Sequence, residues 1–264
     1  MIHELNMEKE KKMGRMTKDR YGFSGPVGTS LFCEPPYHIR DSENLLLFYE
    51  ADADAVADIL PEGVELLGTP PIVQVLVNKT IFSNAGPHHG TYIFPQCQFE
   101  GKPYCFEYFL MVTTDVAMAS GREFWGDSKK ICHTDFVWEA NEVFTTVERP
   151  KGLRLVTTHF RIESMAAPEE LPEMHPGLCL KMIPSSEEGA PLCVHQYVQD
   201  SLDFVPAVGA DGKPELYRGT GSIMMDMETE VWPIYRLKPL KMLSAFYIRG
   251  SFDLSYGKIL KDFK

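Results

Sequence analysis

The chain has 264 residues, of which 44% are hydrophobic, and it carries a formal net charge of −11. That length and hydrophobic content are sufficient for one large domain with a sizeable core. The acidic balance argues against a general nucleic-acid binder, which needs a basic face. It does not exclude a small anionic substrate, since a local cationic pocket can exist on an acidic protein.

The six cysteines form no CxxC pair and are scattered through apolar segments, which is typical of buried free thiols in a reducing compartment. We therefore expect a cytoplasmic protein. Residues 1–20 are charged and lack the apolar segment of a secretory signal, so they predict a mobile arm ahead of a single domain, 21–264. The sequence contains no run of 18 apolar residues, so we expect no membrane span.

In chain order, residues 44–50 read as a buried strand, and 52–60 as a short helix with Asp52 as its N-cap. Long strand patterns follow at 71–82 and at the aromatic-rich 104–114. Residues 115–125 change to a helical period, with Asp115 as the expected cap.

A hairpin is predicted from 136–148 and 152–164, joined by the turn signal RPKG. Three more strand candidates follow at 178–184, 193–202 and 221–228, with a loop at 209–221. The end of the chain, 243–263, reads as a strand, a turn and a closing segment. Many short strands with few helices indicate an antiparallel barrel or sandwich.

The stretch GREFWGDSKK ends on two adjacent lysines, Lys129 and Lys130. Only a neutral amine attacks a carbonyl, and an ordinary lysine, with a pKa of about 10.4, is almost entirely charged at pH 7. Burial or a nearby cation lowers that pKa. We weight burial more, because successive side chains on a strand point to opposite faces. From the residues alone, the alternative of two solvated lysines is the more frequent case.

Three blocks resemble the acetoacetate decarboxylase family. They are the GRE segment followed by the lysine pair, the closing FDLSYGKILKDF, and the early block YHIRDSENLLLFYEADADAVADILPEGVEL. The likeness covers residues 35–263. It implies an α+β, mainly β fold, an antiparallel cone-shaped β-barrel with a few short helices, usually in a homo-oligomer. It also implies that Lys129 is the Schiff-base nucleophile and Lys130 the neighbouring cation, with no cofactor and no metal.

The sequence departs from the family pattern at four places. Ser128 replaces the proline before the lysines, and Gly90 stands where one family glutamate aligns. A second glutamate position falls near Leu76 or Val75. The arginine that holds the substrate carboxylate aligns with Ser42. Arg40 lies two residues earlier and is predicted to substitute, because residues two apart on a strand share a face.

Other candidates come from the residues near these blocks. His88 and His89 lie in a Gly-Pro-bounded loop close to the lost glutamate, and His89 is predicted to contact substrate as an acid-base group. Glu107, in the aromatic strand, is predicted to face the cavity. The remaining histidines lack metal-ligand spacing.

The GRE segment supplies three further candidates. Glu123 is predicted to be structural, with a catalytic role as the alternative. Phe124 and Trp125 are predicted to be wall residues that keep the amine dry.

These residues lead to the hypothesis of a Schiff-base lyase for a small keto acid, with decarboxylation of an acetoacetate-like β-keto acid as the leading reaction. The alternative is an aldolase-dehydratase that condenses a keto acid such as pyruvate with an aldehyde through the same lysine. A further alternative is a non-catalytic small-molecule binding protein of the same fold, which the missing glutamates favour.

Overall fold

The computed structural model describes residues 13–200 and 202–264. The chain divides into two compact units, Met1–Cys33 and Glu34–Lys264. The described part of the first unit holds one short 3-10 turn, η1 (Lys18–Arg20). Most of the arm predicted at 1–20 lies outside the described residues, and the boundary at residue 20 stays a prediction. No helix in the described part of the chain is both long and apolar enough to cross a membrane.

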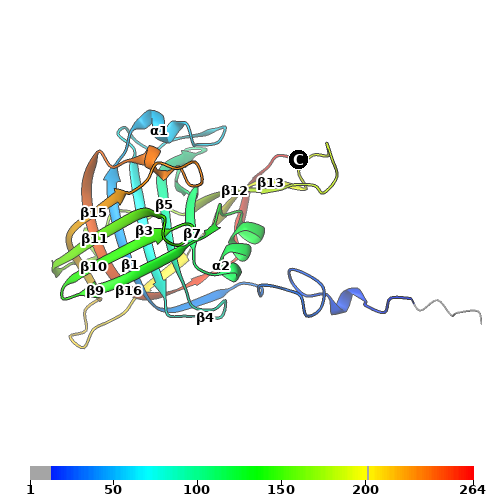
Figure 1. The fold of residues 1–264 in the computed structure, drawn as a ribbon, viewed down its shortest axis with the longest axis horizontal. Helices are drawn as coiled ribbons and strands as arrows, with labels where there is room; N and C mark the ends of the chain where they lie inside the picture. The colour runs from blue at the N-terminus through cyan, green and yellow to red at the C-terminus, as the bar shows by residue number, and fades with distance from the viewer. Residues whose placement is uncertain (1–12, 201) are drawn as a thin grey trace, which may run out of the picture. The chain divides into compact units, whose positions relative to one another are not determined.

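The second unit is mainly antiparallel β-structure (Figure 1). Its long strands, which bear most of the core, are β1 (Tyr37–Glu50), β3 (Ile72–Thr80), β5 (His88–Phe99), β9 (His133–Glu139), β10 (Glu142–Glu148), β11 (Arg154–Met165), β15 (Leu216–Met225) and β16 (Lys241–Leu254). The shorter strands are β2 (Val64–Leu66), β4 (Phe82–Ser83), β6 (Lys102–Phe106), β7 (Phe109–Val112), β8 (Lys130–Ile131), β12 (Gly177–Ile183), β13 (Val194–Asp200), β14 (Leu202–Pro206) and β17 (Lys258–Asp262).

The helical elements of this unit are few and short. They are α1 (Ala53–Ala57), α2 (Asp115–Ser120), the π-helical turn η2 (Gly121–Trp125), η3 (Pro168–Glu170) and η4 (Ile234–Leu237). Asp52 caps α1 as predicted, accepting a hydrogen bond from the Ala55 amide at 2.9 Å. The cap of α2 is Thr114 rather than the predicted Asp115, because the Thr114 hydroxyl accepts from the Ala117 amide.

Strand β1 is central, since it pairs antiparallel with β3 on one edge and β16 on the other. Its side chains are buried on both faces, because Leu45 and Leu47 pack in one cluster while Leu46 and Phe48 pack in another. This explains why 44–50 reads as a continuous apolar run rather than an alternating one. The mainly β prediction with few helices is confirmed.

Two predicted strands are each divided in the structure. The pattern at 104–114 becomes β6 and β7, which are separated at Glu107 and Tyr108. The pattern at 136–148 becomes β9 and β10, a hairpin whose turn includes Ala140 at a positive φ of 52°. Residues 142–148 then pair with β11 as the predicted hairpin. The first of these breaks matters for the site, because it gives Glu107 a backbone that departs from the sheet.

Candidate active site

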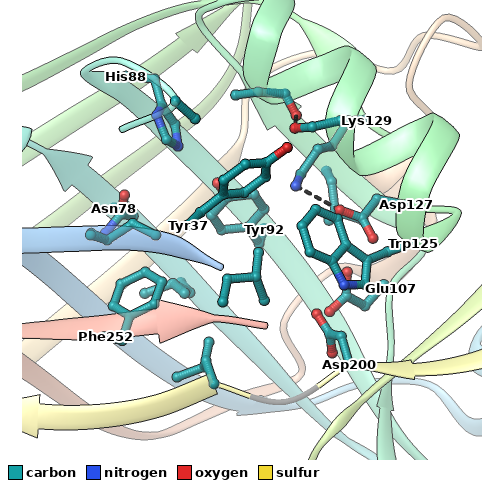
Figure 2. Close-up of a pocket in the computed structure, with 18 of the residues that line it drawn as sticks. Tyr37, Asn78, His88, Tyr92, Glu107, Trp125, Asp127, Lys129, Asp200 and Phe252 are labelled. Atoms are coloured by element: carbon teal, nitrogen blue, oxygen red, sulfur yellow. Dashed lines mark hydrogen bonds and ion pairs between the residues drawn. The ribbon is translucent and has the colours of Figure 1, made fainter. Parts of the chain in front are cut away.

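A cavity of about 100 Å³ lies beside α2 and η2, in contact with strands β1, β3 and β5 (Figure 2). Figure 2 shows two groups of side chains across it. Lys129, Asp127, Trp125, Glu107 and Asp200 lie on one side, and His88, Asn78 and Phe252 lie on the other. Drug-sized pockets enclose about 300–1,000 Å³, so this cavity suits a much smaller ligand.

Lys129 points into the cavity and pairs with Asp127. Its Nζ lies 2.6 Å from Asp127 Oδ2, and the two side chains are only 11% and 4% exposed. Gly121, the glycine of GRE, leaves room for this pair. A Cβ at position 121 would lie 2.8 Å from Lys129 Nζ and 2.6 Å from Asp127 Oδ2. The glycine of the motif is therefore explained by the ion pair it accommodates.

The charge state of Lys129 differs from the sequence-based expectation. Burial alone lowers the pKa of the amine, but the negative charge of Asp127 and its hydrogen bond to the amine outweigh burial and raise that pKa above its usual range. The amine is buried, as expected, yet its raised pKa makes it an ammonium ion. Any chemistry that needs a neutral amine must first move a proton, and Asp127 is within hydrogen-bond distance to accept it.

Lys130 does not enter the cavity. Its Nζ donates to the carbonyl oxygen of Val231, and burial with the charges of Arg149 and Arg122 lowers its pKa. It is absent from the cavity lining, as expected for neighbours on an extended segment. Lys130 was predicted to be the cation beside the Lys129 amine. Its side chain is directed to the Val231 carbonyl instead, outside the cavity lining.

The GRE segment contacts the site through the Arg122 guanidinium and through the aromatic residues that follow it. Arg122 Nη1 donates to the Lys129 carbonyl oxygen at 3.3 Å. Glu123 was predicted to be structural, with a catalytic role as the alternative; it is exposed and does not line the cavity, so its position does not favour that alternative. Trp125 is 1% exposed and lines the cavity, whereas Phe124 packs edge-on against Trp125 at 4.6 Å and does not line it. Of the two predicted wall residues, Trp125 is the one that lines the cavity.

Glu107 faces the cavity, as predicted, and meets Asp200 of β13 there. The two carboxyl groups are hydrogen-bonded. Burial and the charge of Asp200 raise the pKa of Glu107 well above its usual range, and burial with the charge of Asp127 raises the pKa of Asp200 to about 6. Asp127 and Asp200 were not predicted from the sequence.

Tyr92 occupies the space where a family glutamate would project. A Cβ on Gly90 would overlap the Tyr92 ring and hydroxyl, so the ring folds over the glycine on the same face of β5. Lys129 Nζ lies 5.9 Å from the ring centroid, and burial raises the pKa of Tyr92 to about 12. Leu76, opposite Tyr92 on β3, also lines the cavity. At the position that the resemblance aligns with a family glutamate, the Tyr92 ring therefore fills the space over Gly90.

Of the two loop histidines, His88 lines the cavity and His89 does not. His89 Nδ1 lies 3.2 Å from the Thr134 carbonyl oxygen, and its amide donates to Thr113. His88 Nδ1 lies 3.1 Å from the Gly86 carbonyl oxygen, and burial lowers the pKa of its ring. The structure therefore places His88 at the cavity, and not His89, for which substrate contact was predicted.

Arg40 lies at the surface, where its side chain is 44% exposed and its Nη1 is 2.7 Å from Asp253 Oδ1. Arg40 was predicted to take the place of the family arginine because residues two apart on a strand, such as Arg40 and Ser42, normally share a face. A β-bulge between Ile39 and Ser42, with Asp41 at a positive φ of 54°, interrupts the alternation. Ser42 is buried while Arg40 is exposed, so the prediction that Arg40 binds substrate is corrected by the bulge.

One group in the described part of the chain has spacing compatible with a metal ion. Ligand atoms of Glu107, Asp127 and Cys179 lie within 4.8 Å of one another. Cys179 Sγ donates to Asp127 Oδ1 at 3.2 Å, and the Lys129 ammonium already pairs with the other oxygen. A metal ion here would have to compete with that ammonium.

The fold and the cavity together define a mainly antiparallel β protein with a buried lysine surrounded by carboxyl groups. The chain matches the family described as acetoacetate decarboxylase (ADC) over residues 24–263, and it belongs to that family. Among curated relatives, the protein named decarboxylase DEC1 of Cochliobolus heterostrophus is 27% identical over 238 residues, covering 85% of this chain and 90% of that protein.

Two solved structures share the fold. The acetoacetate decarboxylase of Legionella pneumophila superposes with a TM-score of 0.81 at 21% identity, covering 93% of this chain and 95% of that one. The enduracididine biosynthesis enzyme MppR, complexed with the condensation product of pyruvate and imidazole 4-carboxaldehyde, gives a TM-score of 0.74 at 19% identity, with 96% and 100% covered. At these identities the likeness supports the fold alone.

Proposed function

We propose that this protein is a lyase that decarboxylates a small β-keto acid through an imine at Lys129. The observation that carries the proposal is a buried lysine directed into a small cavity, in a chain that belongs to the acetoacetate decarboxylase family. A lysine imine acts as an electron sink for the pair released when a β-carboxylate leaves as carbon dioxide.

Asp127 supplies the base that this mechanism needs. The ammonium and the carboxylate are 2.6 Å apart, so a proton can pass from Lys129 to Asp127 as a ketone approaches. The neutral amine then attacks the carbonyl carbon. This replaces the sequence-based hypothesis of an amine kept neutral by burial or by Lys130.

The cavity wall also bears on the leaving carboxylate. Among the described residues that line it, Lys129 is the one lysine or arginine, and Asp127 and Asp200 contribute negative charge. A substrate carboxylate therefore has no second fixed cation to hold it. Its loss as neutral carbon dioxide relieves both repulsion and desolvation.

The second candidate is an aldolase-dehydratase, in which the same enamine attacks an aldehyde. The structural likeness to MppR, bound to a condensation product of pyruvate, favours it. The small cavity favours decarboxylation, because the aldol reaction must hold two molecules at once.

The proposal also includes a cone-shaped β-barrel, a homo-oligomer and a cytoplasmic location. Two series of paired strands support the closure of the sheet into a barrel. One series runs in the order β1, β3, β5, β7 and β8. The other runs in the order β9, β10, β11, β15 and β16, and its last strand pairs with the opposite edge of β1. Strand β9 lies against β5, and its Thr134 carbonyl is 3.2 Å from His89 Nδ1 of β5.

Borohydride reduction tests the function. The protein is mixed with acetoacetate, acetone or pyruvate, reduced, and analysed by intact mass and peptide mapping. We expect an adduct on Lys129 that is lost in Lys129→Arg and retained in Lys151→Arg, a matched change at an exposed lysine. Carbon dioxide with acetone identifies decarboxylation, and a new carbon–carbon bond from pyruvate and imidazole 4-carboxaldehyde identifies the aldol reaction. No adduct with any of the three leaves a binding protein.

A further inference from the structure

Glu107 and Asp200 meet in a space that Gly177 leaves open. A Cβ on Gly177 would overlap both Glu107 Oε1 and Asp200 Oδ1, so the two oxygens converge on one point. Gly177 and Asp200 are paired across β12 and β13, and the Gly177 amide donates to the Asp200 carboxylate. The backbone thus brings two carboxyl groups together at the cavity wall.

The position of Glu107 is fixed by its main chain. Its amide donates to the Leu178 carbonyl oxygen at 3.0 Å, and the Ser128 hydroxyl donates to the carbonyls of Glu107 and Tyr108. Ser128 immediately precedes the reactive lysine. One hydroxyl, which the family's proline lacks, therefore links the lysine segment to the acidic one.

The proposed decarboxylation leaves an enamine that needs a proton at carbon, and most groups lining the cavity cannot give one at neutral pH. His88 has a lowered pKa and its Nδ1 is bound to Gly86, so its Nε2 carries a lone pair rather than a proton. Tyr92, with a pKa of about 12, is a weak acid. In the proposed mechanism Asp127 passes the proton taken from Lys129 to the hydroxyl that leaves as water during imine formation, so Asp127 is a carboxylate when the enamine forms, and the Cys179 proton is directed at it.

We propose that Glu107, as a neutral carboxylic acid, protonates the enamine carbon, and that Asp200 acts as a positioning residue that keeps the proton on Glu107. This inference depends on the proposed imine at Lys129. The resemblance does not identify Glu107 as a proton donor, because the two family glutamates align elsewhere, at Gly90 and near Leu76.

In the decarboxylation step, one carbon–carbon bond breaks and one carbon–hydrogen bond forms. The bond to the carboxylate carbon breaks, carbon dioxide leaves, and its electron pair forms the enamine with neutral nitrogen. The enamine carbon takes the Glu107 proton, which leaves a Glu107 carboxylate and an iminium at Lys129. Water hydrolyses the iminium to ketone and lysine, and a solvent proton restores Glu107.

The surroundings keep Glu107 protonated until it is used. Burial contributes most, and the charges of Asp200 and Asp127 act in the same direction, while the Lys129 ammonium opposes them. The other titratable groups that face it are Cys105 and Cys179 from adjacent strands and Tyr92 across the cavity, and burial holds all three neutral by raising their pKa values. A carboxylic acid of raised pKa is a suitable general acid near pH 7.

Exchange in D₂O tests the proposal without the full substrate, because imine, enamine and proton return also exchange the methyl protons of acetone. For Glu107→Gln we expect exchange to fall about a hundredfold or more, while the borohydride adduct of acetone on Lys129 changes less than about threefold. Glu107→Asp, which keeps an acid, should recover part of the exchange. Glu188→Gln, at an exposed position, is the matched control.

The outcomes separate the two proposals. No adduct in the unmodified protein overturns the imine function and this inference with it. An adduct together with undiminished exchange in Glu107→Gln overturns this inference alone. Loss of the adduct in Glu107→Gln places Glu107 at the amine and also overturns it. For Asp200→Asn we expect the alkaline loss of exchange to begin at lower pH, since removing that charge lowers the pKa of Glu107.

Discussion

Lys129 Nζ lies 2.6 Å from Asp127 Oδ2, and both side chains are nearly inaccessible to solvent. Two residues apart on an extended segment, the two groups face the same cavity. In the proposed mechanism this pair provides the nucleophile together with its base, and the amine stays an ammonium ion until a ketone binds. It also makes the site a buried ion pair, whose removal affects folding as well as chemistry.

Asp127→Asn tests both effects. Without the carboxylate, burial dominates and the pKa of Lys129 falls, so adduct formation with acetone should extend to lower pH than in the unmodified protein. Because the pKa of Lys129 is raised in the folded state, its ammonium form favours folding below the unfolded value of about 10.4, pH 7 included, and this contribution is lost as pH rises through the folded value. Urea unfolding at pH 7 should therefore show a loss of about 3 kcal/mol.

The double variant Asp127→Asn with Lys129→Met is the control for the stability effect. Removing both charges leaves no unpaired ion, so it should be more stable than Asp127→Asn alone. If the single variant unfolds at the same urea concentration as the unmodified protein, the two side chains do not form a buried pair.

Much of the fold could be predicted from the sequence, because strand alternation, caps and turn residues are local signals. The helix after Asp52 and the hairpin across 149–153 are examples. Two of the sequence-based predictions failed, and both failed because of a local feature of the backbone. The bulge at Asp41 turns Arg40 outward, and nothing in the residue types announces it. The break at Glu107 is hidden inside an apolar aromatic run.

The candidate site was predictable only where a motif or a short spacing carried it. Lys129 and Trp125 lie in the GRE-to-lysine segment, and Asp127 was detectable there, since a carboxylate two residues before a lysine on an extended segment shares its face. Asp200 lies 71 residues beyond Lys129 in sequence and reaches the cavity only through the pairing of β12 and β13. The Tyr92 ring over Gly90 is a packing result.

Ser128→Ala should weaken the link between the lysine and acid segments. The variant loses hydrogen bonds to the Glu107 and Tyr108 carbonyls, which corresponds to about 1 kcal/mol of unfolding free energy. We expect acetone exchange to fall more than adduct formation, because Glu107 is displaced while Lys129 keeps its pair. Ser186→Ala, at an exposed serine, is the comparison. Equal losses of exchange and adduct would show that Ser128 positions the lysine instead.

The raised pKa values of Glu107 and Asp200 predict a dependence of stability on pH. A carboxyl whose pKa is higher in the folded state favours folding most at acid pH, and this contribution is lost as pH rises through the folded value, about 6 for Asp200. The Asp200→Asn variant has no carboxyl at this position, so its stability does not fall in this way as the pH rises. In urea titrations it should therefore be more stable than the unmodified protein at pH 8, by roughly 1–3 kcal/mol, and show little gain near pH 4. A gain that is the same at both pH values would contradict the raised pKa.

Arg40→Ala and Lys130→Ala test the two sequence-based roles that the structure redirects. Arg40 pairs with Asp253 at the surface, where an exposed ion pair contributes only about 0–1 kcal/mol. Lys130 donates to the Val231 carbonyl outside the cavity. With acetoacetate as substrate, we expect kcat and KM to change less than about threefold in each, since neither side chain lines the cavity. A large rise in KM for Arg40→Ala would mean that the segment carrying the bulge rearranges on binding and brings its guanidinium to the substrate carboxylate. A shift of the pH profile of adduct formation in Lys130→Ala would restore the neighbouring-cation hypothesis.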